Sequence, residues 1–153
     1  MSQVQHPPLE PVRAVVTMLE DAGLTVALGG SAILAWLGLV ERVGDWDVTV
    51  DADPDEVIEL LDRAELEWEN RTDHSFPFAS RARFTIAAPG HEIDVLVGFA
   101  LYDGSDLIPI PVHVAGHWLG LPIARPHDWL VAYRLMGRLE RAEALRAHVE
   151  KSD

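Results

Sequence analysis

The sequence predicts a fold of the α/β (α+β) class, in which helices flank a single mixed β-sheet. Strand-like and helix-like segments alternate along the first half of the chain, a hairpin pattern follows, and the last part is helical in pattern. With 153 residues and 48% hydrophobic content, the chain has enough material for one good core but not for two. We therefore predict one domain over residues 1–153, with a core at about 11–124 and C-terminal helices at about 126–150.

The first elements alternate helix, strand and helix. Residues 11–23 begin with a proline, space their apolar side chains as a helix does and end in glycine, which indicates an amphipathic helix. Residues 24–28, LTVAL, have the composition of a buried strand. A Gly-Gly turn follows, and Ser31 is a suitable N-cap for an apolar helix over residues 32–40.

The middle of the chain predicts more strands and one helix. Residues 45–50, DWDVTV, alternate polar and apolar side chains as a half-buried strand does. Residues 53–64 carry a capping aspartate, a proline at the first helical position and apolar side chains at helical spacing. Residues 67–75 predict a loop or a short edge strand. The segments 81–87 and 92–99 form a hairpin pattern around a Pro-Gly turn.

The last third predicts short strands followed by helices. Residues 108–124 combine a strand-like composition with several prolines, which favours short edge strands and turns. Residues 125–149 are helical in pattern, and Gly137 is expected to divide them into two helices.

Composition excludes several classes of chemistry. No cysteine is present, which rules out disulfides and thiolate metal sites. Lys151 is the only lysine, so a phosphate-binding loop of the Gly-Lys-Ser/Thr kind and Schiff-base catalysis are excluded. The formal net charge of −13 opposes non-specific binding to nucleic acids and to anionic membranes.

The sequence predicts a soluble protein of the cytoplasm. No apolar run reaches the roughly 18 residues that span a bilayer. The N-terminal residues have neither the basic region nor the apolar region of an export signal.

Two neighbouring features combine phosphate and metal chemistry. The turn at Gly29 and Gly30 leads into a helix N-terminus at Ser31, where backbone N–H groups can bind phosphate without a lysine. Asp45 and Asp47 lie two residues apart on one strand face, about 6.5 Å between Cα atoms, so both can reach one metal ion or a close metal pair. Magnesium suits such a set of oxygen ligands.

A third acid is expected from the later strand. Asp94 interrupts an apolar strand and lies on the face opposite to Ile93, Val95 and Val97. A carboxylate in such surroundings needs a partner, because a buried charge is costly unless it is paired or bound to a metal. Glu92 shares its face and is the alternative, but Asp94 lies deeper in the strand. Three carboxylates would complete a two-metal site for phosphoryl transfer.

Structural explanations remain open for each of these residues. Asp45 and Asp47 are also compatible with a half-exposed strand that has no site, and Gly29 and Gly30 with a plain tight turn. Arg83 and Arg42 either help to neutralise a triphosphate or form surface ion pairs.

The Gly-Gly-Ser turn, the short helix, Asp-x-Asp on a strand and a lone Asp on a later strand resemble the polymerase-beta-like nucleotidyltransferase superfamily. The resemblance is to its minimal bacterial members, which include antibiotic nucleotidyltransferases and the nucleotidyltransferase halves of toxin–antitoxin pairs. It covers residues 24–99 and continues more weakly into the C-terminal helical region. The expected fold is therefore the nucleotidyltransferase fold.

The resemblance implies a function and a role for each site residue. The expected reaction transfers a nucleoside monophosphate from a nucleoside triphosphate, with ATP favoured, to a hydroxyl acceptor and releases pyrophosphate. Gly30 and Ser31 would contact the phosphates, with Gly29 beside them. Asp45 and Asp47 would hold two Mg²⁺ ions, for which Mn²⁺ can substitute. Asp94 would be a metal ligand and the general base.

Relatives often have a lysine in the later helix, where this chain offers Arg134 and, one turn later, Arg138. Arginine keeps the positive charge and can bind phosphate through two N–H groups. Arg42, Arg83 and Arg134 are therefore the predicted nucleotide-binding cations. The acceptor is expected to be held in part by a second subunit, as in a homodimer, or by a partner protein, because a chain this short has little room for an acceptor domain.

Two other functions remain as alternatives. One is a non-catalytic binding module on the same fold, such as an antitoxin, for which the strong negative charge suits a basic partner. The other is a metal-dependent phosphohydrolase or nuclease. It ranks last, because the restriction-type nuclease signature needs a lysine close to its acids.

Overall fold

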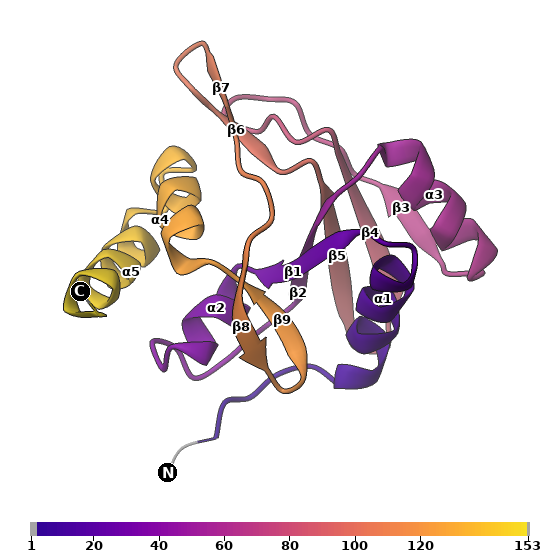
Figure 1. Cartoon of the computed structure of the whole chain (residues 1–153), viewed down its shortest axis with the longest axis horizontal. Coiled ribbons are helices and arrows are strands. Elements are labelled where there is room, and N and C mark those ends of the chain that lie inside the picture. Colours follow the sequence, from indigo (N-terminus) through magenta and orange to yellow (C-terminus); the bar gives the residue numbers. More distant parts are fainter. Residues whose placement is uncertain (1–2, 153) are drawn as a thin grey trace.

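A seven-stranded mixed sheet forms the centre of the computed structural model, which describes residues 3–152, the side chains of residues 151 and 152 excepted (Figure 1). The strand order is β3-β4-β5-β2-β1-β9-β8. The strands of this sheet are β1 (Thr25–Gly29), β2 (Trp46–Asp51), β3 (Trp68–Asn70), β4 (Ala82–Ala88), β5 (His91–Val97), β8 (Val114–Trp118) and β9 (Leu121–Ala124). This architecture confirms the predicted fold class.

Five helices and a small hairpin complete the described part of the chain. The hairpin pairs β6 (Ala100–Asp103) with β7 (Asp106–Pro109) and stands apart from the main sheet (Figure 1). The helices are α1 (Leu9–Asp21), α2 (Ser31–Trp36), α3 (Pro54–Arg63), α4 (Pro126–Leu135) and α5 (Leu139–Ser152). None of the helices in residues 3–152 is both long and apolar enough to span a bilayer.

The alternation of side chains along the two central strands separates a buried face from a functional one. On β2, Trp46, Val48 and Val50 are fully buried. β5 pairs in parallel with β2, and its alternate residues Ile93, Val95 and Val97 are equally buried, as the sequence predicts. The polar residues Asp47 and Asp94 are their neighbours along the strands, so they belong to the other face.

The apolar helix after the Gly-Gly turn is shorter than predicted. It begins at Ser31 and ends at Trp36, whereas the sequence predicted a helix over residues 32–40. Gly38 adopts a positive φ of 75° two residues later, and the N–H of Leu39 donates to the Leu34 carbonyl, which closes the helix. The N-cap is Gly30 rather than the expected Ser31, which becomes the first helical residue.

Two further elements differ from the prediction. α1 begins at Leu9, before the proline that was expected to start it. The proline-containing segment 108–124 was expected to form edge strands, and β8 is one, but β9 lies inside the sheet between β1 and β8. All four residues of β9 are buried. Its backbone pairing with β1 is limited to Leu28 and Ile123, so the proline at its second position leaves little pairing to disturb.

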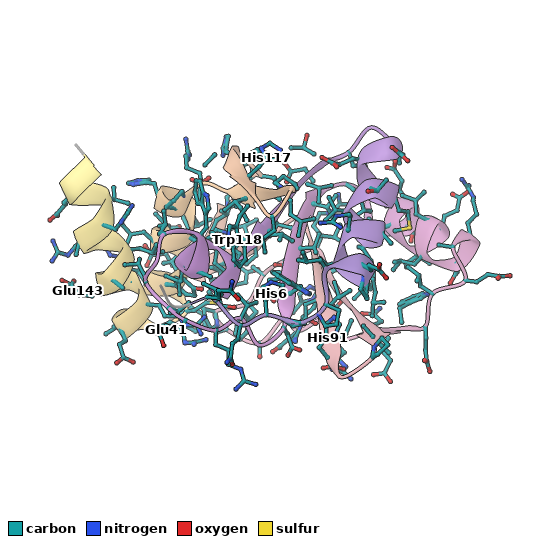
Figure 2. The ribbon with its side chains drawn as sticks, turned by 90° about the horizontal axis from the view of Figure 1, so that it is seen from below. His6, Glu41, His91, His117, Trp118 and Glu143 are labelled. Carbon is teal, nitrogen blue, oxygen red and sulfur yellow. The ribbon has the colours of Figure 1, made fainter. Side chains whose placement is uncertain are left out.

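The N-terminal segment packs against the end of the sheet that lies lowest in Figure 1. Gln5 exchanges backbone hydrogen bonds with Glu41 and Val43. This pairing places the His6 ring 5.8 Å from the Trp46 ring and 6.0 Å from the Trp118 ring, between centroids. Figure 2 shows His6 and Trp118 on this lower side, with Glu143 well away on α5.

The two C-terminal helices are divided at Gly137, as predicted, with a φ of 76° at that glycine. α4 lies directly against the sheet through Trp129, which is buried and stacks on Phe99 with 4.9 Å between ring centroids. A Cβ added to Gly29 would lie 2.0 Å from the Trp129 ring. The missing side chain at Gly29 therefore allows α4 to approach strand β1.

We expect Gly29→Ala to destabilise the protein by about 1–3 kcal/mol, because the added methyl group overpacks the contact with the Trp129 ring. Chemical denaturation measures the change in the free energy of unfolding. Gly44→Ala is the matched control, because a Cβ there meets no atom within 4 Å. Equal effects of the two substitutions would contradict the close contact between α4 and β1.

Candidate active site

Two carboxylates lie side by side at the centre of the sheet. Asp47 on β2 is in direct register with Asp94 on the parallel neighbour β5, and on its other side it is in register with Gly29. Both side chains line one pocket. The sequence predicted these two acids together with Asp45, and the parallel pairing of two strands distant in the chain brings Asp47 and Asp94 into one pocket.

The charged form of the Asp47 carboxylate is in an unfavourable environment. Burial and the nearby Asp94 carboxylate raise its pKa to about 7, against the lowering effect of Arg83 and Arg141. Asp45 adds a further raising effect. A carboxylate in this state gains free energy from any cation that approaches it.

Gly30 leaves the space that the Asp47 carboxylate occupies. A Cβ on Gly30 would lie 2.2 Å from Oδ2 of Asp47. Gly30 also has a φ of 61° and a ψ of −139°, a backbone conformation that only glycine adopts readily. The turn before α2 and the acid on β2 therefore depend on glycine at this position.

Asp94 is held in place by strand β4. Arg83 donates from Nη2 to Oδ2 of Asp94 at 3.0 Å, and the Thr85 hydroxyl donates to Oδ1 at 2.6 Å. The Asp94 side chain is only 17% exposed. Hydrogen bonds to a charged acceptor are stronger than those between neutral groups, so this strand fixes the direction of the carboxylate.

The acid pair lies in a pocket of about 300 Å³ between the sheet, the loop before β4, and the helices α4 and α5. Its lining is partly charged and partly aromatic. The lining residues are Gly30, Asp47, Thr72, Asp73, Phe78, Ser80, Ala82, Arg83, Asp94, Leu96, Phe99, Trp129, Tyr133, Met136, Arg138 and Arg141.

The C-terminal region brings two arginines to the pocket, Arg141 from α5 and Arg138 from the link before it. Arg141 donates to the Tyr133 hydroxyl at 3.2 Å and lies over that ring, 5.6 Å from its centroid. Burial raises the pKa of Tyr133, so its hydroxyl stays neutral at physiological pH. Arg138 lines the same wall. With Arg83 on the sheet side, these residues surround the acid pair with positive charge.

Of the two arginines that the sequence offered in this region, Arg138 lines the pocket, together with Arg141, and Arg134 does not. Arg134 is exposed on α4 and does not line the pocket. Trp129 and Tyr133 are one helical turn apart and face inward, so the residue after Tyr133 faces outward. That spacing was the available signal, but it identifies the inward face only once α4 is known to lie on the sheet.

The other predicted residues do not belong to the pocket lining: Gly29, Ser31, Arg42 and Asp45. Oδ1 of Asp45 accepts a hydrogen bond from the Glu92 N–H at 3.0 Å, just before β2 begins. Arg42 is exposed, and its backbone forms an isolated parallel β-bridge with Gln5 in the N-terminal segment. Gly29 contacts Trp129, as described above. Ser31 is the residue after the pocket-lining glycine.

The acid pair fits a divalent cation of the magnesium type. Mg²⁺ is usually bound in proteins by one or two carboxylates together with phosphate oxygens of the substrate. Asp47 and Asp94 supply such a pair, and the raised pKa of Asp47 reflects its burial and the neighbouring Asp94 carboxylate. Within residues 3–152, no three His, Asp or Glu side chains converge on one point as a ready-made metal site.

Comparison with solved structures identifies the fold. A "putative nucleotidyltransferase (TM1012)" from Thermotoga maritima matches with a TM-score of 0.66 and 19% identity, over 94% of this chain and 92% of that one. The chain has a nucleotidyltransferase fold. The sequence alone supports no closer assignment, since no family model and no curated protein matches it.

Two structures of one further protein with the nucleotidyltransferase fold agree. The crystal structure of ANT(2")-Ia in complex with adenylyl-2"-tobramycin has a TM-score of 0.52 and 15% identity, over 91% of this chain and 87% of that chain. The solution structure of the antibiotic-resistance factor ANT(2'')-Ia has a TM-score of 0.50 and 16% identity, over 92% and 90%. These likenesses confirm the expected nucleotidyltransferase fold.

The raised pKa of Asp47 predicts a pH dependence of stability. Between pH 4 and pH 7 the folded protein binds a proton that the unfolded chain releases, so this residue makes folding less favourable as the pH rises. Asp47→Asn removes the effect. We expect the variant to be more stable than the wild type at pH 8, by up to about 4 kcal/mol, and to lose most of that advantage at pH 4.

Denaturant unfolding of both proteins across this pH range measures the difference, in which the titration of all other groups largely cancels. A difference that stays constant with pH would mean that Asp47 has an ordinary pKa in the folded protein.

Proposed function

We propose that this chain is a Mg²⁺-dependent nucleotidyltransferase that transfers a nucleoside monophosphate from a nucleoside triphosphate to a hydroxyl acceptor and releases pyrophosphate. The observation that carries the proposal is the Asp47–Asp94 pair, in register on parallel strands and facing a pocket with three arginines. The nucleotidyltransferase fold supports the same reaction class.

The phosphate groups would be bound between the glycine turn and the C-terminal helices. Gly30 has no side chain to obstruct them, and Arg138 and Arg141 offer planar guanidinium groups that suit phosphate oxygens. Tyr133 orients Arg141 through its hydroxyl. These residues form the wall of the pocket that lies towards β1 and α4, and we propose them as the triphosphate-binding wall.

Asp94 is proposed as the general base. Thr85 and Arg83 direct its carboxylate, and an acceptor hydroxyl that enters beside it would give its proton to one of the carboxylate oxygens. Arg83 would then offset the charge that develops on the acceptor oxygen. Positioning and charge compensation of this kind supply most of the catalysis in phosphoryl transfer.

Asp47 and Asp94 would hold Mg²⁺, or Mn²⁺ in its place, and Asp45 would join them by releasing the Glu92 N–H. A bound divalent ion neutralises the phosphates and activates the attacking oxygen, and two ions would stabilise both ends of the displacement. ATP is the proposed donor, since the structural neighbour ANT(2")-Ia is known in complex with an adenylyl product.

A second candidate is a non-catalytic binding module of the same fold. Asp45 is bonded to a backbone N–H and Asp94 to Arg83 and Thr85, so two of the three predicted acids already have protein partners. Such a module, like an antitoxin, would bind a partner protein without nucleotide chemistry. Nucleotide binding separates the two candidates.

We expect Mg²⁺ with ATP to raise the melting temperature of the wild type, since a ligand at a hundredfold excess over Kd adds about 2.7 kcal/mol of stability. Asp47→Asn and Asp94→Asn should lose this shift while remaining folded, because each removes a metal-binding charge. Asp21→Asn, on the outer surface of α1, is the control that keeps it. No shift with any of the four triphosphates, and no transfer of labelled nucleotide, would favour the binding module.

The triphosphate-binding wall can be tested with a matched pair of arginines. We expect Arg138→Gln to weaken binding of Mg-ATP about tenfold, because a charge-assisted bond to a phosphate is lost. Arg134→Gln removes the same charge from the exposed side of α4, outside the pocket lining, and should change Kd by less than about twofold. Calorimetry measures both, and equal losses would show that only the overall charge matters.

A further inference from the structure

The pocket has a second wall whose chemistry limits the acceptor. This acceptor wall comes from the loop before β4 and from β4 itself, and consists of Thr72, Asp73, Phe78, Ser80, Ala82 and Arg83. In the sheet order, Asp94 lies between β4 and β2, whereas Gly30 and α4 lie on the far side of β2. With phosphates bound beside Gly30, an acceptor reaches Asp94 from this wall.

The charged residues of the pocket lining balance in number, with three aspartates (Asp47, Asp73 and Asp94) and three arginines (Arg83, Arg138 and Arg141). Arg83 is bonded to Asp94 at 3.0 Å, and hydrogen bonds from Ser75 lower the pKa of Asp73. An acceptor with several ammonium groups would therefore find no surplus of negative charge in this lining, and its contacts with the arginines would bring like charges together, which opposes binding.

Three polar side chains of the acceptor wall are hydrogen-bonded to other groups of the protein. The Thr72 hydroxyl donates to Asn70 at 2.6 Å and accepts from the Arg83 N–H at 3.1 Å. Oδ1 of Asp73 accepts from the Ser75 N–H at 2.8 Å. The Ser80 hydroxyl accepts from the Ala100 N–H at 3.2 Å. A sugar with many hydroxyls would have to share or displace these bonds, which favours an acceptor with few hydroxyls.

The group that this wall does offer is an aromatic ring. Phe78 lines the pocket and is 39% exposed, although phenylalanine gains from burial. Its backbone is fixed, because it bridges to Leu101 of β6 and its N–H donates to the Ser75 carbonyl. The apolar lining continues inward through Leu96 and Phe99. An apolar ligand would cover these surfaces without breaking any hydrogen bond.

We propose that the acceptor is an uncharged aromatic alcohol whose ring packs on Phe78 while its hydroxyl reaches Asp94. This inference rests on the proposed function and adds the substrate class. In the reaction, the acceptor oxygen forms a bond to the α-phosphorus of the triphosphate. The bond from that phosphorus to the bridging oxygen breaks, pyrophosphate leaves, and the hydroxyl proton passes to Asp94. Phe78 is the residue that determines acceptor specificity.

The experiment compares three small hydroxyl compounds: 2-phenylethanol, glucosamine and glycerol. Each is added to the wild-type protein with Mg²⁺ and a non-hydrolysable ATP analogue, and saturation-transfer NMR measures its binding. We expect 2-phenylethanol to bind and the charged amino sugar and the polyol to bind at least tenfold more weakly. Transfer of labelled nucleotide from ATP to each compound is then measured.

Three variants identify the contact. Phe78→Ala should weaken 2-phenylethanol binding about five- to tenfold, which corresponds to the loss of one aromatic pair. Phe78→Tyr keeps a ring and should restore it. Phe76→Ala is the matched control, because Phe76 is 67% exposed on the same loop but does not line the pocket. All three should keep the thermal shift with Mg-ATP.

The outcomes separate this inference from the proposed function. Tighter binding of glucosamine or glycerol, unchanged binding in Phe78→Ala, or no binding of 2-phenylethanol to protein that does bind Mg-ATP would overturn the acceptor class alone. Failure of the wild type to bind any nucleotide would remove the proposed function, and this inference with it.

Discussion

Two carboxylates in register on neighbouring parallel strands impose the constraint that the rest of the site accommodates. The pairing of β2 with β5 holds Asp47 beside Asp94, and neither can move away without disrupting the sheet. Such a like-charge contact disfavours ionisation. The surrounding residues compensate unequally: Arg83 and Thr85 bind Asp94, whereas Asp47 keeps a raised pKa. Asp94 is thus held by protein partners, whereas Asp47 keeps an unfavourable charge that a bound cation would stabilise.

The distribution of charge matters as much as its total. The chain carries a net charge of −13, which repels a nucleotide at long range, yet three of its twelve cations line a single pocket. Focusing of local charge in a cleft can reverse the sign of the potential that a ligand meets on arrival. Arg138, in the link between α4 and α5, and Arg141 on α5 are two of these arginines, so the C-terminal region completes the pocket as well as covering the sheet.

Local patterns in the sequence predicted the parts of the fold that depend on neighbouring residues. The alternation in β2 and β5 assigned the faces of Asp47 and Asp94, and the glycine turn marked the start of α2. Apart from Asp94, whose apolar surroundings marked it as a further acid of the site, the sequence did not reveal partners that come from elsewhere in the chain. The Glu92 N–H that binds Asp45 and the approach of Trp129 to Gly29 both arise from tertiary packing. The position of Arg134 outside the pocket lining has the same origin, since only that packing decides which face of α4 meets the pocket.

The parallel pairing of β2 and β5 also determines when the site can form during folding. A parallel connection needs a long crossover, here through α3, β3 and β4, so the closure of a large loop precedes the contact. Contacts of this range form late and slowly compared with hairpins and helices. During synthesis the glycine turn and Asp47 are therefore made before Asp94, which joins them only when β5 pairs with β2. Metal and nucleotide would bind only to chains in which the central sheet is complete, so binding would follow the folding of this part of the chain.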